Sequence, residues 1–218
     1  MEALLGAAHG PRPGLPLDVL AGLSALAIVP FIVVMTTSFL RIVVVLSLVR
    51  SAIGASSLPP NAVLTGLALV LTFAIMSPAI DRISHDAVTP YGAGKISQAR
   101  FLERAFDPLR AFMLRQTHER DVALFARVAR VPIVRANDAP PSVLVPAFVV
   151  GELRSGFAIG FALYLPFVAI DLAVASILMG LGMFMLSPPI VSLPCKLLLF
   201  VMVDGWALVC GGIVSSFR

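Results

Sequence analysis

Residues 142–189 read SVLVPAFVVGELRSGFAIGFALYLPFVAIDLAVASILMGLGMFMLSPP and carry three charged side chains, Glu152, Arg154 and Asp171. A helix that crosses the hydrocarbon core of a bilayer needs roughly 20 predominantly apolar residues, so this stretch exceeds one crossing. It opens an apolar block over residues 142–213 that prolines interrupt. The block predicts two long helices that fold back on each other at residues 187–189, as membrane-type hairpins of an all-α fold.

A second apolar block covers residues 15–80. Its part over residues 15–53 carries charge at Asp18, Arg41 and Arg50. As one straight helix this part would be about 58 Å long, nearly twice the ~30 Å hydrocarbon core. We therefore expect Pro30 to bend it, or part of it to pack against other protein. A second apolar helix is predicted over residues 61–80.

The segment between the blocks, residues 81–141, has the composition of a small soluble module, with seven acidic and ten basic residues. It predicts a loop at 89–94 and three helices, which begin at Ser97, at Asp107 with Pro108, and near Asp121. The organisation predicted for the chain is thus a single subunit, residues 1–218, with a charged helical insertion between apolar blocks. Arg41 and Arg50 favour a cytoplasmic position for the first block's connection and a periplasmic one for the module.

Composition also excludes several function classes. With 59% hydrophobic residues and a mean hydropathy of +0.99, the chain is too apolar for a water-soluble domain. No long basic run indicates nucleic-acid binding. The sequence has no phosphate loop and no HExxH motif, and His9, His85 and His118 are too scattered to suggest a metal site. We therefore expect no catalytic residues, no metal and no cofactor, which disfavours a membrane hydrolase.

Charges inside the apolar blocks are the first candidate site residues. Each unpaired charge at a bilayer centre costs roughly 2.5 to 3.5 kcal/mol on insertion scales, so these side chains need partners or hydration. Glu152 and Arg154 are two positions apart and cannot face one another on a helix. A hairpin near residues 187–189 could bring Asp171 towards Lys196 or Asp204. Two interpretations stay open for such charges, a buried pair that fixes helix register and a direct part in transport. The full set is Arg41, Glu152, Arg154, Asp171, Lys196 and Asp204.

The second candidate is the segment GLGMFMLSPP, residues 180–189. Met183, Phe184 and Met185 stand between glycines that loosen the helix and prolines that end it. Methionine fills irregular space and repacks around a changing neighbour, so a ring of these side chains would form a deformable apolar seal. Ordinary core packing is the alternative. Gly156 and Gly160 form a GxxxG pattern that permits close helix approach.

Several long motifs together resemble one family. TSFLRIVVVLSLVR (37–50), PPN (59–61) with GLAL (66–69), and VSLPCKLLLF (191–200) followed by VDGW (203–206) are similar to the R subunit of type III secretion export apparatus, whose flagellar counterpart is FliP. The resemblance covers about residues 15–210 in the expected order.

This resemblance implies a core pore-forming subunit of the export gate, through which unfolded proteins leave the bacterial cytoplasm. It implies a homo-oligomer, a pentameric ring, that assembles in the inner membrane with the S and T subunits and other export-apparatus membrane proteins. Its helices would be largely lifted out of the lipid. The family's methionine gasket corresponds to Met183, Phe184 and Met185, with phenylalanine as a departure, and its assembly ion pair to Asp171 and Lys196.

Two further points remain open in the sequence. The N-terminus lacks the features of a cleaved signal peptide, which favours a virulence injectisome over a flagellar system. The alternative function is a small membrane channel or secondary transporter, whose charges would line a path without dedicated partners.

Overall fold

The computed structural model describes residues 27, 30–54, 59–133 and 135–217. The chain divides into two compact units, Met1–Val34 and Met35–Arg218, and the labelled elements α2 to α9 belong to the second unit. Most of the predicted apolar stretch before Pro30, with Asp18, lies outside the described residues.

The described residues form helices and turns, with no strand among them, which confirms the all-α prediction. A short helix, Pro30–Thr36, precedes the labelled elements. These are α2 (Phe39–Ile53), α3 (Asn61–Ile83), the π-helix η1 (Ser84–Val88), α4 (Thr89–Gly92), α5 (Gln98–Gln116), α6 (Glu119–Ala129), the 3-10 turn η2 (Ala136–Asp138), α7 (Pro141–Gly180), α8 (Pro188–Met202) and α9 (Gly205–Ser215).

The helix after α2 is longer than predicted. α3 starts at Asn61 as expected but continues through η1 and α4 to Gly92, so the loop predicted at 89–94 is wrong for its first four residues. Pro90 lies in the first turn of α4, directly after η1, so this continuous run of helix contains a residue without a backbone N–H donor. The wider π-turn before it absorbs the change in register.

The charged segment folds as two helices where three were predicted. Ser97 caps α5 and accepts a hydrogen bond from the backbone N–H of Arg100, as predicted. The new helix expected at Pro108 is wrong, because α5 runs through this proline without a break. Its buried face, with Phe112 and Met113, offsets the cost of an interior proline, which is about 3 kcal/mol. The helix predicted near Asp121 is α6.

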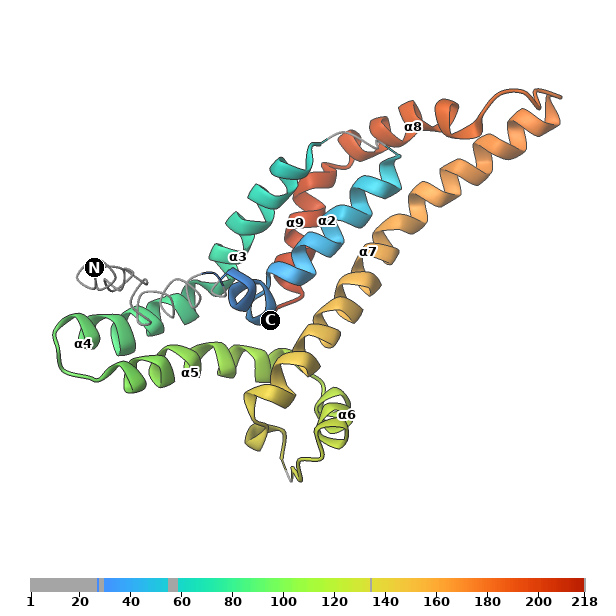
Figure 1. Cartoon of the computed structure of the whole chain (residues 1–218). Helices are drawn as coiled ribbons and strands as arrows, with labels where there is room; N and C mark the ends of the chain where they lie inside the picture. Colours follow the sequence, from blue (N-terminus) through green and yellow to red (C-terminus); the bar gives the residue numbers. More distant parts are fainter. Residues whose placement is uncertain (1–26, 28–29, 55–58, 134, 218) are drawn as a thin grey trace, which may run out of the picture. The chain divides into compact units, whose positions relative to one another are not determined.

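α7 is the longest of the described elements (Figure 1), and it contributes side chains to two hydrophobic cores. It runs for 40 residues, or about 60 Å, through Pro146 and Pro166. One core contains side chains from α2, α3, α7, α8 and α9, centred on Ile42 and Leu46. The other contains side chains from α3, α5, α6 and α7, centred on Met113 and Phe148.

Close contact between α2 and α7 depends on the predicted glycine pattern. A Cβ atom at Gly156 would lie 3.2 Å from Val44 Cγ1, and one at Gly160 would lie 2.3 Å from Leu48 Cδ1. These two glycines therefore let α2 approach α7 more closely than alanines would.

The last apolar helix of the prediction is in fact two helices. α7 and α8 fold back as predicted, but at residues 181–187 and not at 187–189, because Pro188 and Pro189 form the first turn of α8. The chain also bends by 65° between α8 and α9. Asp204 stands at this bend with φ of 49°, a left-handed conformation that ends α8 and starts α9.

Among the residues that the structure describes, two helices are long and apolar enough to cross a membrane, Asn61–Gly92 and Pro141–Gly180, or up to four if two bent helix pairs each count as one span. Only 11% of the most apolar window of Pro141–Gly180 is buried by the rest of the chain. Most residues of this window are therefore left for lipid or other protein to cover.

Candidate functional site

Every charged side chain of α7 pairs with a different neighbouring element. Glu152 binds Arg41 of α2, Arg154 binds Asp121 of α6, and Asp171 binds Lys196 of α8. The three pairs lie at successive levels of the long helix. Each one therefore fixes the position of a separate helix against α7.

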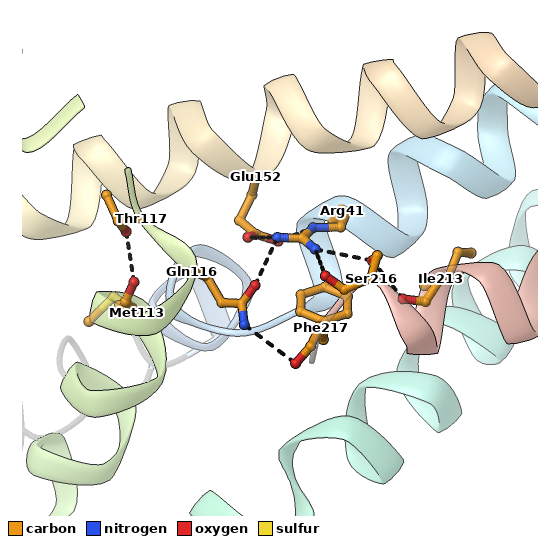
Figure 2. Close-up of polar contacts among 8 residues, drawn as sticks. All are labelled: Arg41, Met113, Gln116, Thr117, Glu152, Ile213, Ser216 and Phe217. Atoms are coloured by element: carbon orange, nitrogen blue, oxygen red, sulfur yellow. Dashed lines mark hydrogen bonds and ion pairs between the residues drawn. The ribbon is translucent and has the colours of Figure 1, made fainter. Parts of the chain in front are cut away.

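Arg41 is the centre of a buried polar network (Figure 2). Its Nε atom donates to Glu152 Oε2 at 3.0 Å, while Nη1 donates to the Ser216 carbonyl oxygen at 2.9 Å and Nη2 donates to Gln116 Oε1 at 3.3 Å. The guanidinium carbon lies 3.8 Å from the centre of the Phe217 ring. One side chain thus ties together α2, α5, α7 and the residues that follow α9.

This network explains how two charges tolerate full burial. Arg41 and Glu152 are both buried, and an isolated buried charge would be strongly unfavourable. Each guanidinium nitrogen of Arg41 has a partner, and Glu152 accepts from two of them. Such a pair contributes little net stability as a unit, but the loss of one member leaves an uncompensated charge.

Arg154 and Asp121 form a bidentate pair between α7 and α6. The two guanidinium nitrogens lie 2.7 and 2.8 Å from the two carboxylate oxygens. Asp121 is buried, whereas the Arg154 side chain is 42% exposed. The hydrogen bonds from Arg154 lower the pKa of Asp121 below its usual value, against the opposing effect of burial. Asp121 is therefore held as a carboxylate.

Asp171 and Lys196 meet across the α7–α8 hairpin. Lys196 Nζ lies 2.6 Å from Asp171 Oδ2, and the Ser192 hydroxyl donates to Asp171 Oδ1 at 2.6 Å. Lys196 Nζ also donates to the carbonyl oxygen of Ala52 at 3.2 Å. Ala52 is in the last turn of α2, where carbonyl groups lack helical partners and a positive charge is favourable. Lys196 therefore holds three helices together.

The turn between α7 and α8 exposes the predicted seal residues. The exposed fractions are 44% for Met183, 79% for Phe184 and 101% for Met185. Gly182 ends the helix with φ of 75°, and the Met183 N–H donates back to the Leu178 carbonyl oxygen at 2.9 Å. Three large apolar side chains thus lie on a closed turn, where their own chain covers Met183 in part and leaves Phe184 and Met185 mostly exposed.

Two site residues differ from the sequence prediction of buried charge. Arg154 is largely exposed because its guanidinium reaches outward to α6. Asp204 is exposed because the left-handed backbone at the α8–α9 bend turns it away from the core. Of the two partners considered for Asp171, the structure places Lys196 beside it and not Asp204.

Sequence reasoning missed several partners of these charges. Asp121, Gln116 and Ser216 all bind a charged site residue. Asp121 is recognisable only as the start of a helix, and its partner Arg154 lies 33 positions away. No local spacing in the sequence connects such pairs. Among the described residues, no group of three or more His, Cys, Asp or Glu side chains is placed to hold a metal ion.

Comparison with known proteins gives one consistent result. The sequence matches the FliP family over residues 22–213. It is 49% identical over 204 residues to the flagellar biosynthetic protein FliP of Pectobacterium carotovorum, an alignment that covers 93% of this chain and 79% of the relative. It is 44% identical over 196 residues to the protein of that name from Bacillus subtilis, covering 89% of each chain, and 48% identical over 197 residues to that of Caulobacter vibrioides, covering 90% and 74%.

Proposed function

Because the chain belongs to the FliP family of flagellar export proteins, we propose that it is one copy in a ring that lines the type III protein export channel. Membership of this family makes the chain a core subunit of the export gate. Its relatives are flagellar biosynthetic proteins, which favours a flagellar apparatus over the virulence injectisome that the N-terminus suggested.

The observation that carries the ring proposal is the exposed α7–α8 turn. Met183, Phe184 and Met185 lie at the end of a helix about 60 Å long, where their own chain covers none of them fully. Large apolar patches of this kind mark surfaces that other molecules cover. Copies arranged around an axis would bring these turns together, and their side chains would close the channel until an extended polypeptide displaces them.

The ion pair of Asp171 and Lys196 supports the same proposal. It lies on the two helices that flank the turn, and Lys196 also binds the end of α2. In the proposed ring, this ion pair holds the turn at a fixed position relative to the rest of the subunit. Subunits with a displaced hairpin would present their seals at different levels and assemble poorly.

The proposal also includes partners and location. The long apolar surface of α7 calls for contact with further copies, with the S and T gate subunits and with other membrane proteins of the apparatus. We place the assembly at the bacterial inner membrane, with the charged segment 81–141 on the periplasmic side and unfolded secreted proteins as the cargo. The role is structural and requires no catalytic step.

A native mass measurement of the complex purified in mild detergent tests this assignment. The expected mass corresponds to a pentamer of this chain, with S and T subunits when they are co-expressed. The variant Met185→Cys should form cross-links between neighbouring copies. The variant Val128→Cys, at an exposed position of α6, is the matched control and should not. A monodisperse monomer that restores export in a strain without its own subunit would contradict the proposal.

A further inference from the structure

A pocket of about 840 Å³ lies beside α6 and the segment that leads from α6 to α7. Its apolar lining includes Val122, Ala126 and Ile133. Its charged lining consists, among the described residues, of one acid, Glu119, and three arginines, Arg127, Arg130 and Arg135. Three positive charges and one negative charge leave an excess of two positive charges around a hollow whose other lining residues are apolar, apart from Asn137.

The three arginines have no acidic partner inside the described part of the chain. None of them lies within 4.0 Å of a carboxylate oxygen there. They are not needed to close α6 either, because the backbone N–H of Val131 already donates to the Ala126 carbonyl oxygen at 3.0 Å. Their positive charge is therefore available to a ligand.

Arg130 has a backbone conformation that normally favours glycine. It ends α6 with φ of 55°, the left-handed position at which glycine is the usual residue and a Cβ atom is unfavourable. A side chain kept at such a position points to a use for that side chain. Arg130 lines the pocket, so we consider ligand binding as the function of its side chain.

Contacts outside the pocket fix the position of the segment that leads from α6 to α7. Arg110 of α5 donates to the carbonyl oxygen of Asn137 at 2.6 Å, and Ala139, just before α7, is buried. Glu119 is in the first turn of α6, while Arg130 follows the last turn, about 16 Å further along the helix axis. The acid is thus at the far end of α6 from Arg130.

We propose that this pocket binds a phosphate group, with Arg127, Arg130 and Arg135 as its ligands. The fork of a guanidinium group matches phosphate oxygens in two parallel hydrogen bonds. The negative charge of a phosphate group offsets the excess positive charge of the lining, fully for a dianion and by half for the singly charged phosphodiester of a lipid, and the apolar residues accept an organic part attached to the phosphate. Two sources present this chemistry, free phosphate and the headgroup of an anionic phospholipid. The site lies outside the proposed seal and its ion pairs.

The test measures binding to the purified complex in two arms. One arm titrates inorganic phosphate, and the other reconstitutes the complex in nanodiscs of phosphatidylglycerol or of phosphatidylcholine and counts retained lipid by native mass spectrometry. The informative variant is Arg130→Gly, because glycine suits the backbone there and leaves the fold intact. It should weaken phosphate binding roughly tenfold, the effect of one charge-assisted hydrogen bond. The triple variant Arg127→Gln, Arg130→Gly, Arg135→Gln should abolish phosphate binding.

Arg100→Gln, on an exposed part of α5, is the control and should bind as the parent does. Saturable binding of inorganic phosphate identifies free phosphate as the ligand, and retention of phosphatidylglycerol alone identifies a lipid headgroup. Either result supports the pocket if Arg130→Gly weakens it. Equal binding by parent and triple variant, or binding of a polyglutamate peptide but of neither phosphate source, would overturn the proposal.

Discussion

Lys196 on α8 and Asp171 on α7 lie 2.6 Å apart, Nζ to Oδ2, on opposite sides of the turn that presents Met183, Phe184 and Met185. The same lysine reaches the carbonyl oxygen of Ala52 at the end of α2. The position of the exposed turn is therefore coupled, through one ammonium group, to the helix that packs most closely against α7.

We predict that the alanine variants of Asp171 and Lys196 each assemble poorly, because either change leaves a partly or fully buried charge without its partner. The loss of one member of a buried pair costs about 3 to 5 kcal/mol. The exchange Asp171→Lys with Lys196→Asp should restore assembly in part, since an aspartate at position 196 cannot donate to Ala52. Size-exclusion chromatography of the detergent complex measures this. Normal assembly of both alanine variants would show that the pair has no role in it.

The Arg41 network predicts a graded response. Arg41→Ala should reduce the free energy of unfolding by about 3 to 5 kcal/mol, because Glu152 stays buried without a counter-charge. Arg41→Lys keeps the charge but loses the planar fork that reaches Glu152, Ser216 and Gln116 together, so its loss should be smaller. Denaturant unfolding in detergent compares the two. A lysine variant as unstable as the alanine variant would show that geometry, not charge, dominates.

The pair of Asp121 and Arg154 predicts a pH dependence below neutrality. The pKa of Asp121 is lowered in the folded chain by the hydrogen bonds from Arg154. Its stabilising effect is therefore complete above the unfolded-state pKa, about 4, and is lost as the pH falls through the lower folded value. Asp121→Asn should lower the thermal midpoint at pH 6, and the gap to the parent should narrow by pH 2. A gap that is constant with pH would refute this assignment.

The glycine contact between α2 and α7 predicts a coupled pair of substitutions. Gly160→Ala places a methyl group against Leu48, and overpacking costs about 1 to 3 kcal/mol. In a Leu48→Ala background the same change should stabilise, since alanine is favoured over glycine in a helix by about 1 kcal/mol. Gly211→Ala in α9, where no atom lies within 4 Å of the new group, is the control. Additive effects at positions 160 and 48 would contradict the packing.

The helical class and most element positions follow from the sequence because apolar length and caps are local signals. Ser97 is a clear case, since its hydroxyl caps α5 as expected. Pro108 misleads because tertiary burial of Phe112 and Met113 offsets the local cost of proline. The break at Asp204 was missed although Gly205 follows it, because the surrounding residues form one apolar run and the left-handed backbone is adopted by the aspartate, not by the glycine.

The kind of site was predictable from the sequence, and so was the pairing of Asp171 with Lys196, but the partners of the other charges were not. Charges in apolar segments need partners, so Arg41, Glu152 and Asp171 could be selected from the sequence. Their partners lie up to 175 positions away in the sequence, and only the packing of the helices against one another decides them. The exposure of Phe184 and Met185 is likewise a property of the folded turn, since the same residues would suit a core equally well.

In the proposed ring, Met183, Phe184 and Met185 from several copies close the export channel. Ion leakage through the closed gate is the measurement that decides whether they do. Apolar constrictions exclude water and ions by dewetting. Changing all three residues to alanine should let small ions leak, and changing them to serine should increase the leak further, while Val128→Ser on the exposed face of α6 should not. The measurement is conductance across membranes that contain the complex. Leakage in both seal variants is the result we predict, and tightness equal to the parent would place the gate elsewhere.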